Sequence, residues 1–241
     1  MNQKTTAAHP FLNKDRQRIR TLFDHVAPRY DFLNHLLSFN LDRIWRRSAI
    51  AELPREGVRF LDACAGTGDL SIALCRQRES AMVYATDFSL PMLATGQAKA
   101  QRFQGQLRFL AGDTLRLPFA DSTFHGAAVA FGIRNVEHLE AGLKELGRVL
   151  APGGKLVLLE FTPYRNRWLR PFFHLYTHRL LPAVGNWLSG SRERANPYLQ
   201  QSVDRWPTGD ELAAELENAG YRDVSWRALF PGNVALHTGQ R

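Results

Sequence analysis

Apolar and polar positions follow two different periods along this chain, and the change of period separates its first quarter from the rest. Between residues 14 and 53, apolar side chains recur three or four positions apart, which is typical of helices that bury one side. This pattern predicts helices over 14–27, 29–34 and 41–53. Residues 1–13 are polar, and we expect no ordered element there.

From residue 58 onward, short apolar runs alternate with helical patterns, as expected of the strand–helix–strand units of a parallel sheet. The predicted strands are 58–63, 82–86, 107–111, 124–131 and 155–161, followed by 224–230 and 234–238. The predicted helices between them are 70–78, 91–103, 139–150 and 211–219. Gly220 is predicted to end the last helix, and Pro231-Gly232 to join the final two strands as a hairpin.

The sequence therefore predicts an α/β fold with a mostly parallel, seven-stranded sheet that ends in an antiparallel hairpin. We divide the chain into an N-terminal helical cap (1–57), a ligand-binding core (58–163), a helical insertion (164–206) and a C-terminal part of the same α/β domain (207–241). The N-terminal helices either cover the mouth of a ligand site or serve only as packing, and the sequence leaves both roles open.

A loop of small residues follows the first predicted strand and lies between two acids, Asp62 and Asp69. Gly66 and Gly68 let a ligand approach the backbone, and Asp69 is the predicted N-cap of the next helix. A dinucleotide site would have a glycine or alanine where this chain has Ser71. Two carboxylates disfavour a pyrophosphate and favour a cationic ligand such as the sulfonium of S-adenosylmethionine. A glycine turn that binds nothing is the alternative.

Further acids follow the next two predicted strands. Asp87 ends the second strand, where a carboxylate can accept both hydroxyls of a ribose. Asp113 and Thr114 follow the third strand, and an acid there can accept a hydrogen bond from the exocyclic amine of adenine. The run Leu117–Phe119 can form a wall against the ring. A surface turn acid without a ligand is the alternative interpretation of Asp87.

Charge and apolar content change this picture in one respect, the choice of partner. The formal net charge is +8, which favours an anionic partner such as nucleic acid, a phosphorylated substrate or an acidic lipid surface. Residues 164–194 hold six arginines and one glutamate among many aromatic and aliphatic side chains. This mixture favours a lipid surface or a partner protein over nucleic acid, with core packing as an equal alternative.

Only two cysteines are present, Cys64 and Cys75, so the sequence offers no disulfide framework and no Cys/His metal motif. This usage fits a reducing compartment such as the cytoplasm, and we expect no metal. Cys64 lies in the glycine loop, and without a neighbouring base we interpret it as a small packed residue rather than a nucleophile. No run of about 18 apolar residues predicts a membrane span, and the first residues are not typical of a secretory signal.

Together these features resemble the class I S-adenosylmethionine-dependent methyltransferases, and further motifs resemble the C-methyltransferases of ubiquinone and menaquinone biosynthesis. The motifs that carry this resemblance are 30–34, 37–46, 65–69, 117–121, 131–136, 160–161, 197–203 and 234–239. They span roughly residues 20–240. The chain departs from the family pattern at Ala65, Asp42 and His125, where a glycine, a histidine and an acid are usual. We expect Ala65 to affect the cofactor's affinity rather than the assignment.

The resemblance implies a Rossmann-like class I methyltransferase fold with S-adenosyl-L-methionine as cofactor. Carried over by position, the cofactor-binding residues are Asp62, Ala65, Gly66, Thr67, Gly68, Asp87, Asp113 and Thr114. The implied reaction is methyl transfer to a ring carbon of a polyprenylated quinol, above all demethylmenaquinol, or the methoxy-benzoquinol of ubiquinone synthesis. Such a carbon becomes nucleophilic when a neighbouring phenol, with a pKa near ~10, loses its proton.

Three residues are candidates for this chemistry: Arg134 to stabilise the phenolate, Asn135 to orient the hydroxyl or a water, and His237 to accept the proton. His125 is the alternative acceptor, and each of these side chains has a structural role as its alternative. The basic and aromatic insertion predicts peripheral contact with an anionic membrane, at the inner face of the cell membrane. A homo-oligomer and a quinone-biosynthesis complex both stay open. No nucleic acid is expected.

Two other functions stay open at this point. One is a methyltransferase that acts on another small apolar phenol. The other is a non-catalytic membrane- or nucleic-acid-binding protein with a vestigial methyltransferase core. A nicotinamide oxidoreductase is least favoured, because of Ser71 and the adenine-side Asp113.

Overall fold

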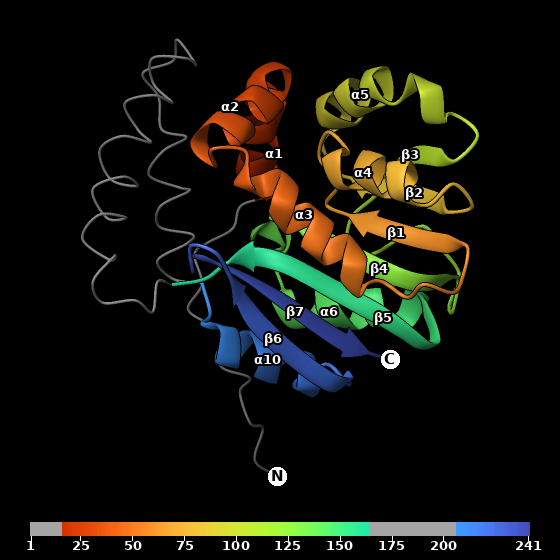
Figure 1. Cartoon of the computed structure of the whole chain (residues 1–241), viewed down its shortest axis with the longest axis vertical. Coiled ribbons are helices and arrows are strands. Elements are labelled where there is room, and N and C mark those ends of the chain that lie inside the picture. Colours follow the sequence, from red (N-terminus) through yellow and green to blue (C-terminus); the bar gives the residue numbers. More distant parts are fainter. Residues whose placement is uncertain (1–15, 164–205) are drawn as a thin grey trace.

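The computed structural model describes residues 16–163 and 206–241, where seven strands form one sheet flanked by helices (Figure 1). The strands are β1 (Arg59–Ala63), β2 (Met82–Asp87), β3 (Leu107–Ala111), β4 (Phe124–Ala130), β5 (Leu150–Phe161), β6 (Arg222–Leu229) and β7 (Val234–Gln240). The helices are α1 (Arg16–Val26), α2 (Tyr30–Leu37), α3 (Leu41–Glu52), α4 (Asp69–Gln77), α5 (Leu90–Lys99), α6 (Leu139–Val149) and α10 (Gly209–Asn218). Short 3-10 turns cover Ala27–Arg29, Gln101–Phe103 and Ile133–Asn135. The predicted polar segment 1–13 and the insertion, apart from Trp206, lie outside the described residues.

The sheet has the strand order β3-β2-β1-β4-β5-β7-β6. β1 to β5 run parallel to one another, whereas β7 is antiparallel to both β5 and β6. The predicted mostly parallel sheet with a closing hairpin is therefore confirmed. The order of the strands changes direction between β1 and β4, and in open α/β sheets ligands bind outside the carboxyl ends of the strands at such a point.

Two apolar layers cover the two faces of the sheet. Side chains of successive strand residues point to opposite faces, so Phe60 and Leu61 of β1 enter different layers. The Phe60 layer includes Ile50 of α3 and Leu74 of α4, and the Leu61 layer includes Leu143 of α6. In Figure 1, α3 crosses the near face of the sheet. The alternation of apolar runs and helical patterns in the sequence reflects this burial on both faces.

Two local predictions are wrong. The N-cap of α4 is Gly68, in a left-handed conformation with φ 76°, and Asp69 is the first helical residue. The Asp69 carboxylate accepts a hydrogen bond from Lys99 at 2.7 Å instead of capping the helix. The predicted start of the fifth strand at residue 155 is the second, because β5 begins at Leu150 and includes Gly153, which takes a φ of 74° beside a shift of the β4–β5 register. Gly220 does follow the end of α10 with a φ of 97°, as predicted.

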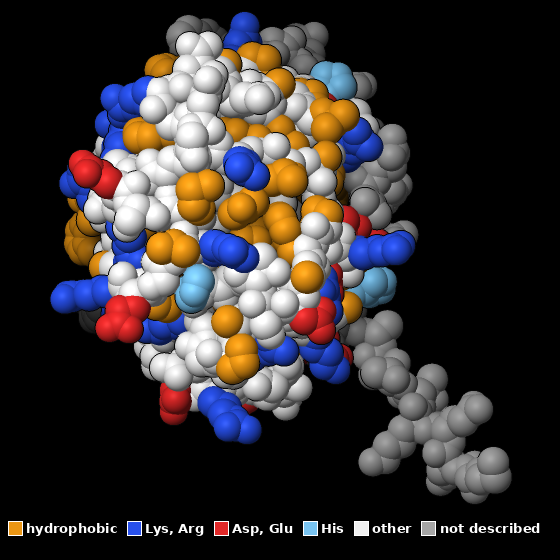
Figure 2. Space-filling model, turned by 90° about the vertical axis from the view of Figure 1, so that its right-hand side faces the viewer, with side chains coloured by type: hydrophobic (Ala, Val, Ile, Leu, Met, Phe, Trp, Pro, Cys, Tyr) orange, Lys and Arg blue, Asp and Glu red, His pale blue; other side chains and the backbone are white. Residues whose placement is uncertain are grey.

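Positive charge is spread over the surface rather than gathered in one stripe on the face shown in Figure 2. There, Lys and Arg side chains surround a central group of apolar side chains and alternate with a few acids. The described residues of this face thus lack the continuous basic track typical of nucleic-acid binding. Among the described helices, none combines the length and the apolar content needed to cross a bilayer.

Candidate active site

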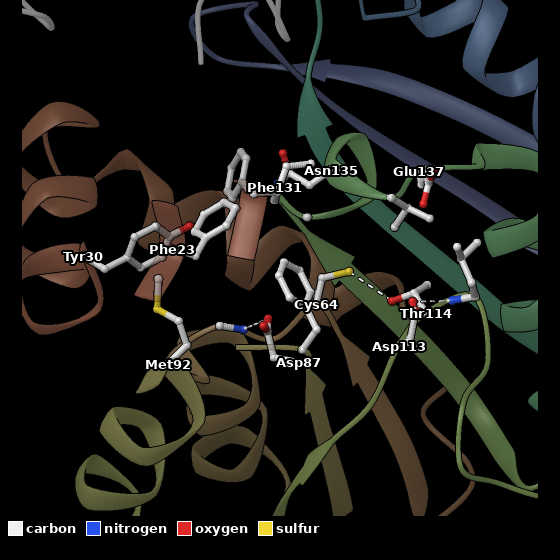
Figure 3. A pocket seen from close by; sticks show the side chains of 16 residues that line it. Phe23, Tyr30, Cys64, Asp87, Met92, Asp113, Thr114, Phe131, Asn135 and Glu137 are labelled. Carbon is white, nitrogen blue, oxygen red and sulfur yellow. Dashed lines mark hydrogen bonds between the residues drawn. The ribbon is translucent and has the colours of Figure 1, made fainter. Parts of the chain in front are cut away.

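A cleft with an empty volume of about 710 Å³ opens where β1, β2 and β4 end. This is the position that the strand order predicts for a ligand site. Its wall combines aromatic and aliphatic side chains with three acids, Asp87, Asp113 and Glu137 (Figure 3).

Asp87 forms the floor of the cleft beside the glycine loop. Its carboxylate accepts hydrogen bonds from the backbone N–H groups of Gly66, at 2.8 Å, and of Ser89, at 2.9 Å. Burial raises the pKa of Asp87, and these two backbone donors oppose that rise. Each carboxylate oxygen keeps a lone pair for a further donor. A ligand with two adjacent hydroxyls, such as a ribose, fits this arrangement.

The two glycines of the loop, Gly66 and Gly68, differ in what a side chain would meet at each position. Gly66 has a φ of 55°, and a Cβ there would come no closer than 3.9 Å to its nearest neighbour, the Tyr30 ring. The backbone at Gly66 is therefore open on the cleft side. Gly68 has a φ of 76°, and a Cβ there would lie 2.7 Å from the Phe109 ring. Gly68 does not line the cleft, and its missing side chain makes room for Phe109, so its expected role in giving clearance to a ligand stays a prediction.

Three other predicted cofactor residues, Asp62, Ala65 and Thr67, are not among the residues that line the cleft. The Thr67 hydroxyl donates a hydrogen bond to Asp31, and Ala65 packs against an apolar layer. Asp62 accepts hydrogen bonds from Ser71, at 3.0 Å from N and 2.6 Å from Oγ. Burial raises the pKa of Asp62 to about 7. Asp62 thus holds the first turn of α4 rather than facing a ligand.

The charge argument from the two acids that flank the loop does not hold in the structure. Asp62 faces Ser71, and Asp69 faces Lys99, so neither carboxylate lines the cleft. The acids that do line it come from later strand ends. The spacing of acids in the sequence locates the strand ends correctly but does not give the direction of each side chain.

Two of the residues predicted to face adenine lie at the cleft, and their role there stays a prediction. Asp113 and Thr114 line the cleft, and Thr114 Oγ1 lies 3.2 Å from the Cys64 sulfur. Leu115 forms the wall there, not Leu117–Phe119 as predicted, because Leu117 is buried in the layer beneath α6. Burial strongly raises the pKa of the Cys64 thiol, which fits its interpretation as a packed residue rather than a nucleophile.

Helices α1 and α2 complete the wall. Ile19, Phe23 and Tyr30 line the cleft, and Figure 3 shows Phe23 and Tyr30 on the side of α1 and α2. From the sequence, these helices either cover the mouth of a ligand site or serve only as packing. Their side chains form part of the cleft wall, which favours the first role. Burial raises the pKa of Tyr30, so its hydroxyl stays protonated at neutral pH.

A network of charged side chains ties α2 and α3 to the loop. Asp31 accepts hydrogen bonds from Thr67 and Lys99. Asp42, one of the departures from the family pattern, is paired with Arg46 and accepts a hydrogen bond from Ser38 at 2.6 Å. Burial alone would raise the pKa of Asp42, but the Ser38 hydrogen bond and the Arg46 charge outweigh burial and lower it. Asp42 therefore belongs to the attachment of these helices.

Of the predicted catalytic residues, only Asn135 lines the cleft. Arg134 is 5% exposed and is paired with Glu160 at 2.5 Å. Its guanidinium also donates to the Phe131 carbonyl at 3.1 Å. Arg134 thus holds the segment that carries Phe131 and Asn135, both of which do line the cleft.

The two candidate histidines lie elsewhere. His237 is 1% exposed in β7, where its Nε2 is 2.9 Å from the Gly209 carbonyl oxygen and its ring stacks on Trp226. His125 lies near the amino end of β4, opposite the cleft, and its Nδ1 accepts a hydrogen bond from the Arg59 N–H at 3.3 Å. The structure therefore does not bring either proposed proton acceptor to the cleft.

Several cleft residues were not singled out from the sequence. Phe23, Met92 and Glu137 line the cleft, and no local motif pointed to Phe23 or Met92. Tyr30 had a signal, because it opens one of the motifs that carry the family resemblance. Glu137 follows another such motif by one residue.

Comparison with known proteins decides the family. A sequence model described as the ubiE/COQ5 methyltransferase family matches residues 12–241. This chain belongs to that family. A protein of Syntrophotalea carbinolica named ubiquinone/menaquinone biosynthesis C-methyltransferase UbiE is 40% identical over 234 residues, which are 95% of this chain and 98% of the relative. A demethylmenaquinone methyltransferase of Thermus thermophilus is 42% identical over 221 residues, 91% of this chain and 100% of the relative.

Solved structures agree on the fold of this methyltransferase. The [4+2]-cyclase SpnF superposes with a TM-score of 0.70 at 15% identity, over 93% of this chain and 95% of the other. A possible histamine N-methyltransferase of Thermotoga maritima superposes with a TM-score of 0.67 at 18% identity, over 91% and 98%. The chain is thus an enzyme of a methyltransferase family and has the class I methyltransferase fold.

Proposed function

We propose that this enzyme methylates a ring carbon of a polyprenylated quinol, converting demethylmenaquinol to menaquinol, acting on the methoxy-benzoquinol of ubiquinone synthesis, or both. The observation that carries the proposal is the identity of about 40% along almost the whole chain to proteins named for these reactions. The cleft supports it, because polar groups that suit a nucleoside lie beside an aromatic chamber that suits a flat ring.

The cofactor half of the site uses few residues. Asp87 accepts the two ribose hydroxyls, the backbone at Gly66 lies against the ligand, and Asp113 with Thr114 faces the adenine. The open space at Gly66 and the unused lone pairs of Asp87 support this assignment. Bound S-adenosylmethionine supplies a methyl group on a positively charged sulfur. Asp62 and Thr67 act indirectly, since their hydrogen bonds hold α4 and α2 against the loop.

The substrate half is built to orient and to exclude water. Phe23, Met92 and Phe131 give an apolar wall for the quinol ring. The Tyr30 hydroxyl, which stays protonated, donates a hydrogen bond to the phenolate oxygen as its charge develops. The bond from sulfur to the methyl group breaks as the bond to the ring carbon forms, and S-adenosylhomocysteine leaves. The phenol proton, and the ring proton that the methyl group replaces, pass to water at the open mouth of the cleft. Asn135 orients the neighbouring hydroxyl. Fixing the ring carbon against the methyl group contributes the largest part of the rate, up to ~7–11 kcal/mol for well-aligned reactants.

We place the reaction at the inner face of the cell membrane, because a polyprenylated quinol dissolves in lipid. The basic and aromatic segment 164–194 that first pointed to a membrane lies outside the described residues. Assembly into a homo-oligomer or a quinone-biosynthesis complex stays a prediction.

A transfer assay tests the function against its alternatives. The purified protein receives methyl-labelled S-adenosylmethionine and, in separate reactions, short-chain demethyl naphthoquinol, benzoquinol, a catechol and a sterol. Label should appear in a quinol and not in the catechol or the sterol. Label in the catechol alone would favour a methyltransferase for other phenols. A calorimetric titration that finds no binding of S-adenosylmethionine would favour a non-catalytic binding protein.

A further inference from the structure

The junction of α2 and α3 exposes an apolar surface, which we call the elbow surface. It consists of Phe32, Leu36, Phe39 and Ile44, with exposed fractions of 58%, 45%, 72% and 56%. Seven large apolar side chains are exposed among the described residues, and four of them fall within these 13 residues. Exposed apolar side chains that gather in this way mark an interaction site, whereas scattered ones do not.

The backbone conformation at the tip of the elbow surface also indicates an interaction site. Phe39 and Asn40 have φ values of 52° and 60°, in the left-handed region. This conformation is uncommon for a bulky residue and is costly unless the surroundings or the function require it. A glycine would make the same turn without strain and without exposing a ring. This turn places the Phe39 ring, which is 72% exposed, at the tip of the elbow surface.

The charges around the elbow surface are arranged by sign. Arg29, Arg43 and Arg47 are exposed to solvent. The two acids of the same stretch, Asp31 and Asp42, turn inward, where Lys99 pairs with the first and Arg46 with the second. Outward-facing charge is thus positive between residues 29 and 47. An apolar patch with a rim of arginines complements the interface of an anionic bilayer.

The elbow surface lies directly behind the cleft wall. Tyr30 of α2 lines the cleft, and Phe32 is two positions further along the same helix. Two residues correspond to about 200° around a helix, so the two side chains point to nearly opposite sides. One helix, about 10–12 Å wide with its side chains, therefore separates the cleft from the elbow surface.

We propose that the elbow surface docks on the interface of an anionic lipid bilayer. Phe32 and Phe39 enter the boundary between headgroups and acyl chains, and Arg43 and Arg47 contact the anionic headgroups. Docking holds the cleft one helix away from lipid, so the ring of the substrate reaches the cleft while its polyprenyl tail stays in the bilayer. The delivery of the substrate ring to the cleft rests on the proposed function, whereas the binding of the elbow surface to lipid does not depend on it.

Vesicle sedimentation of the full-length protein tests the docking. Vesicles of phosphatidylcholine, with and without phosphatidylglycerol, are mixed with wild type, a Phe32→Ser/Phe39→Ser variant and an Arg43→Glu/Arg47→Glu variant. Val58→Ser is the matched control, because Val58 is 49% exposed and precedes β1 at the edge of the sheet opposite the cleft. Far-ultraviolet circular dichroism and thermal unfolding check that each variant folds.

Wild type and the control should bind vesicles that contain phosphatidylglycerol, and salt should weaken this binding. The phenylalanine variant should bind about ten-fold more weakly or worse, since two buried rings are lost. The arginine variant should lose the preference for anionic lipid. Unchanged binding of the phenylalanine variant would overturn the proposal. A change from dimer to monomer in that variant, without a change in vesicle binding, would assign the surface to a second copy instead.

Activity separates this inference from the proposed function. With a long-chain quinol embedded in vesicles, the phenylalanine variant should lose rate by about the same factor as binding, while its rate on a water-soluble short-chain quinol should match that of wild type. If wild type binds vesicles but methylates neither quinol, the proposed function fails and the docking stands. If charge reversal within 164–194 abolishes vesicle binding and the phenylalanine variant binds normally, the docking surface is that segment and the proposal is wrong.

Discussion

Replacing Asp62 with asparagine should remove a pH-dependent part of the protein's stability. The side chain is 2% exposed, and burial raises its pKa from 3.8 to about 7, against the opposing effect of hydrogen bonds from Ser71. In the unfolded chain this carboxyl ionises near 3.8, so unfolding releases a proton between the two pKa values. The stability that the protonated Asp62 contributes is fully present below the unfolded pKa and is lost as the pH rises through the folded one.

The magnitude follows from the two pKa values. One pKa unit corresponds to about 1.4 kcal/mol, so the whole interval is worth about 4 kcal/mol. Between pH ~5 and pH ~8 the loss is about 2–3 kcal/mol, because part of the interval lies below pH ~5. Asp62→Asn cannot ionise and keeps an oxygen that accepts from Ser71. The difference in the free energy of unfolding between Asp62→Asn and wild type should therefore shift by about 2–3 kcal/mol in favour of the variant from pH ~5 to pH ~8.

Urea unfolding of both proteins at pH ~5 and pH ~8 measures this difference. All other titrating groups are shared, so they cancel when the two proteins are compared. Ser71→Ala supplies a second test, because the Ser71 hydroxyl lowers the pKa of Asp62 and its loss should extend the decline to higher pH. Parallel stability curves for wild type and Asp62→Asn would refute the reasoning.

Three further variants test other parts of the structure. Asp87→Asn should weaken the binding of S-adenosylmethionine by about 1.5–3 kcal/mol in calorimetry, the cost of losing a charged acceptor, and an unchanged affinity would remove this residue from the site. Gly68→Ala should destabilise the fold by about 2–4 kcal/mol, because the new Cβ would lie 2.7 Å from the Phe109 ring and because the φ of 76° disfavours alanine. A thermal midpoint equal to that of wild type would contradict this packing role. Arg134→Met should cost about 3–5 kcal/mol of stability, because it leaves the Glu160 carboxylate buried and unpaired. Adding Glu160→Leu should restore much of this loss. If urea unfolding shows the double variant to be no more stable than the single one, the buried ion pair is not the cause.

The sheet could be predicted from the sequence because its central strands β1, β4 and β5 are largely buried on both faces and its helices on one. The apolar runs of β1, β2 and β3 start or end within a residue of their predicted bounds. Local backbone details were harder. The N-cap at Gly68 and the position of Gly153 inside β5 depend on φ values and on a register shift that no spacing of residues reports.

The candidate site was predicted in part, and the misses share one cause. Asp87, Asp113 and Asn135 could be found because the ends of parallel strands and the loops that follow them meet at one edge of the sheet. The directions of Asp62 and Asp69 depend on Ser71 and Lys99, which reach them from neighbouring turns and helices. Contacts of that kind are set by packing, and the strand-and-loop pattern of the sequence does not contain them.

The other misses follow from the same limit. His237 belongs to a motif that resembles the family's, yet its strand is flanked by two others and its ring is enclosed beside Trp226. Phe23 and Met92 reach the cleft from helices whose apolar patterns look like ordinary core positions. The position of such a side chain relative to a ligand depends on how the helices pack, so a sequence motif alone does not establish it.

The bond formed by the transferred methyl group tests the central claim most directly. Purified enzyme is incubated with S-adenosylmethionine labelled with carbon-13 in the methyl group and with a reduced short-chain demethylmenaquinone, and the product is examined by carbon nuclear magnetic resonance. The account predicts a labelled methyl bonded to a ring carbon, with the signal strongly reduced for Asp87→Asn. A labelled methyl bonded to oxygen, or no labelled product from any reduced quinone, would contradict it.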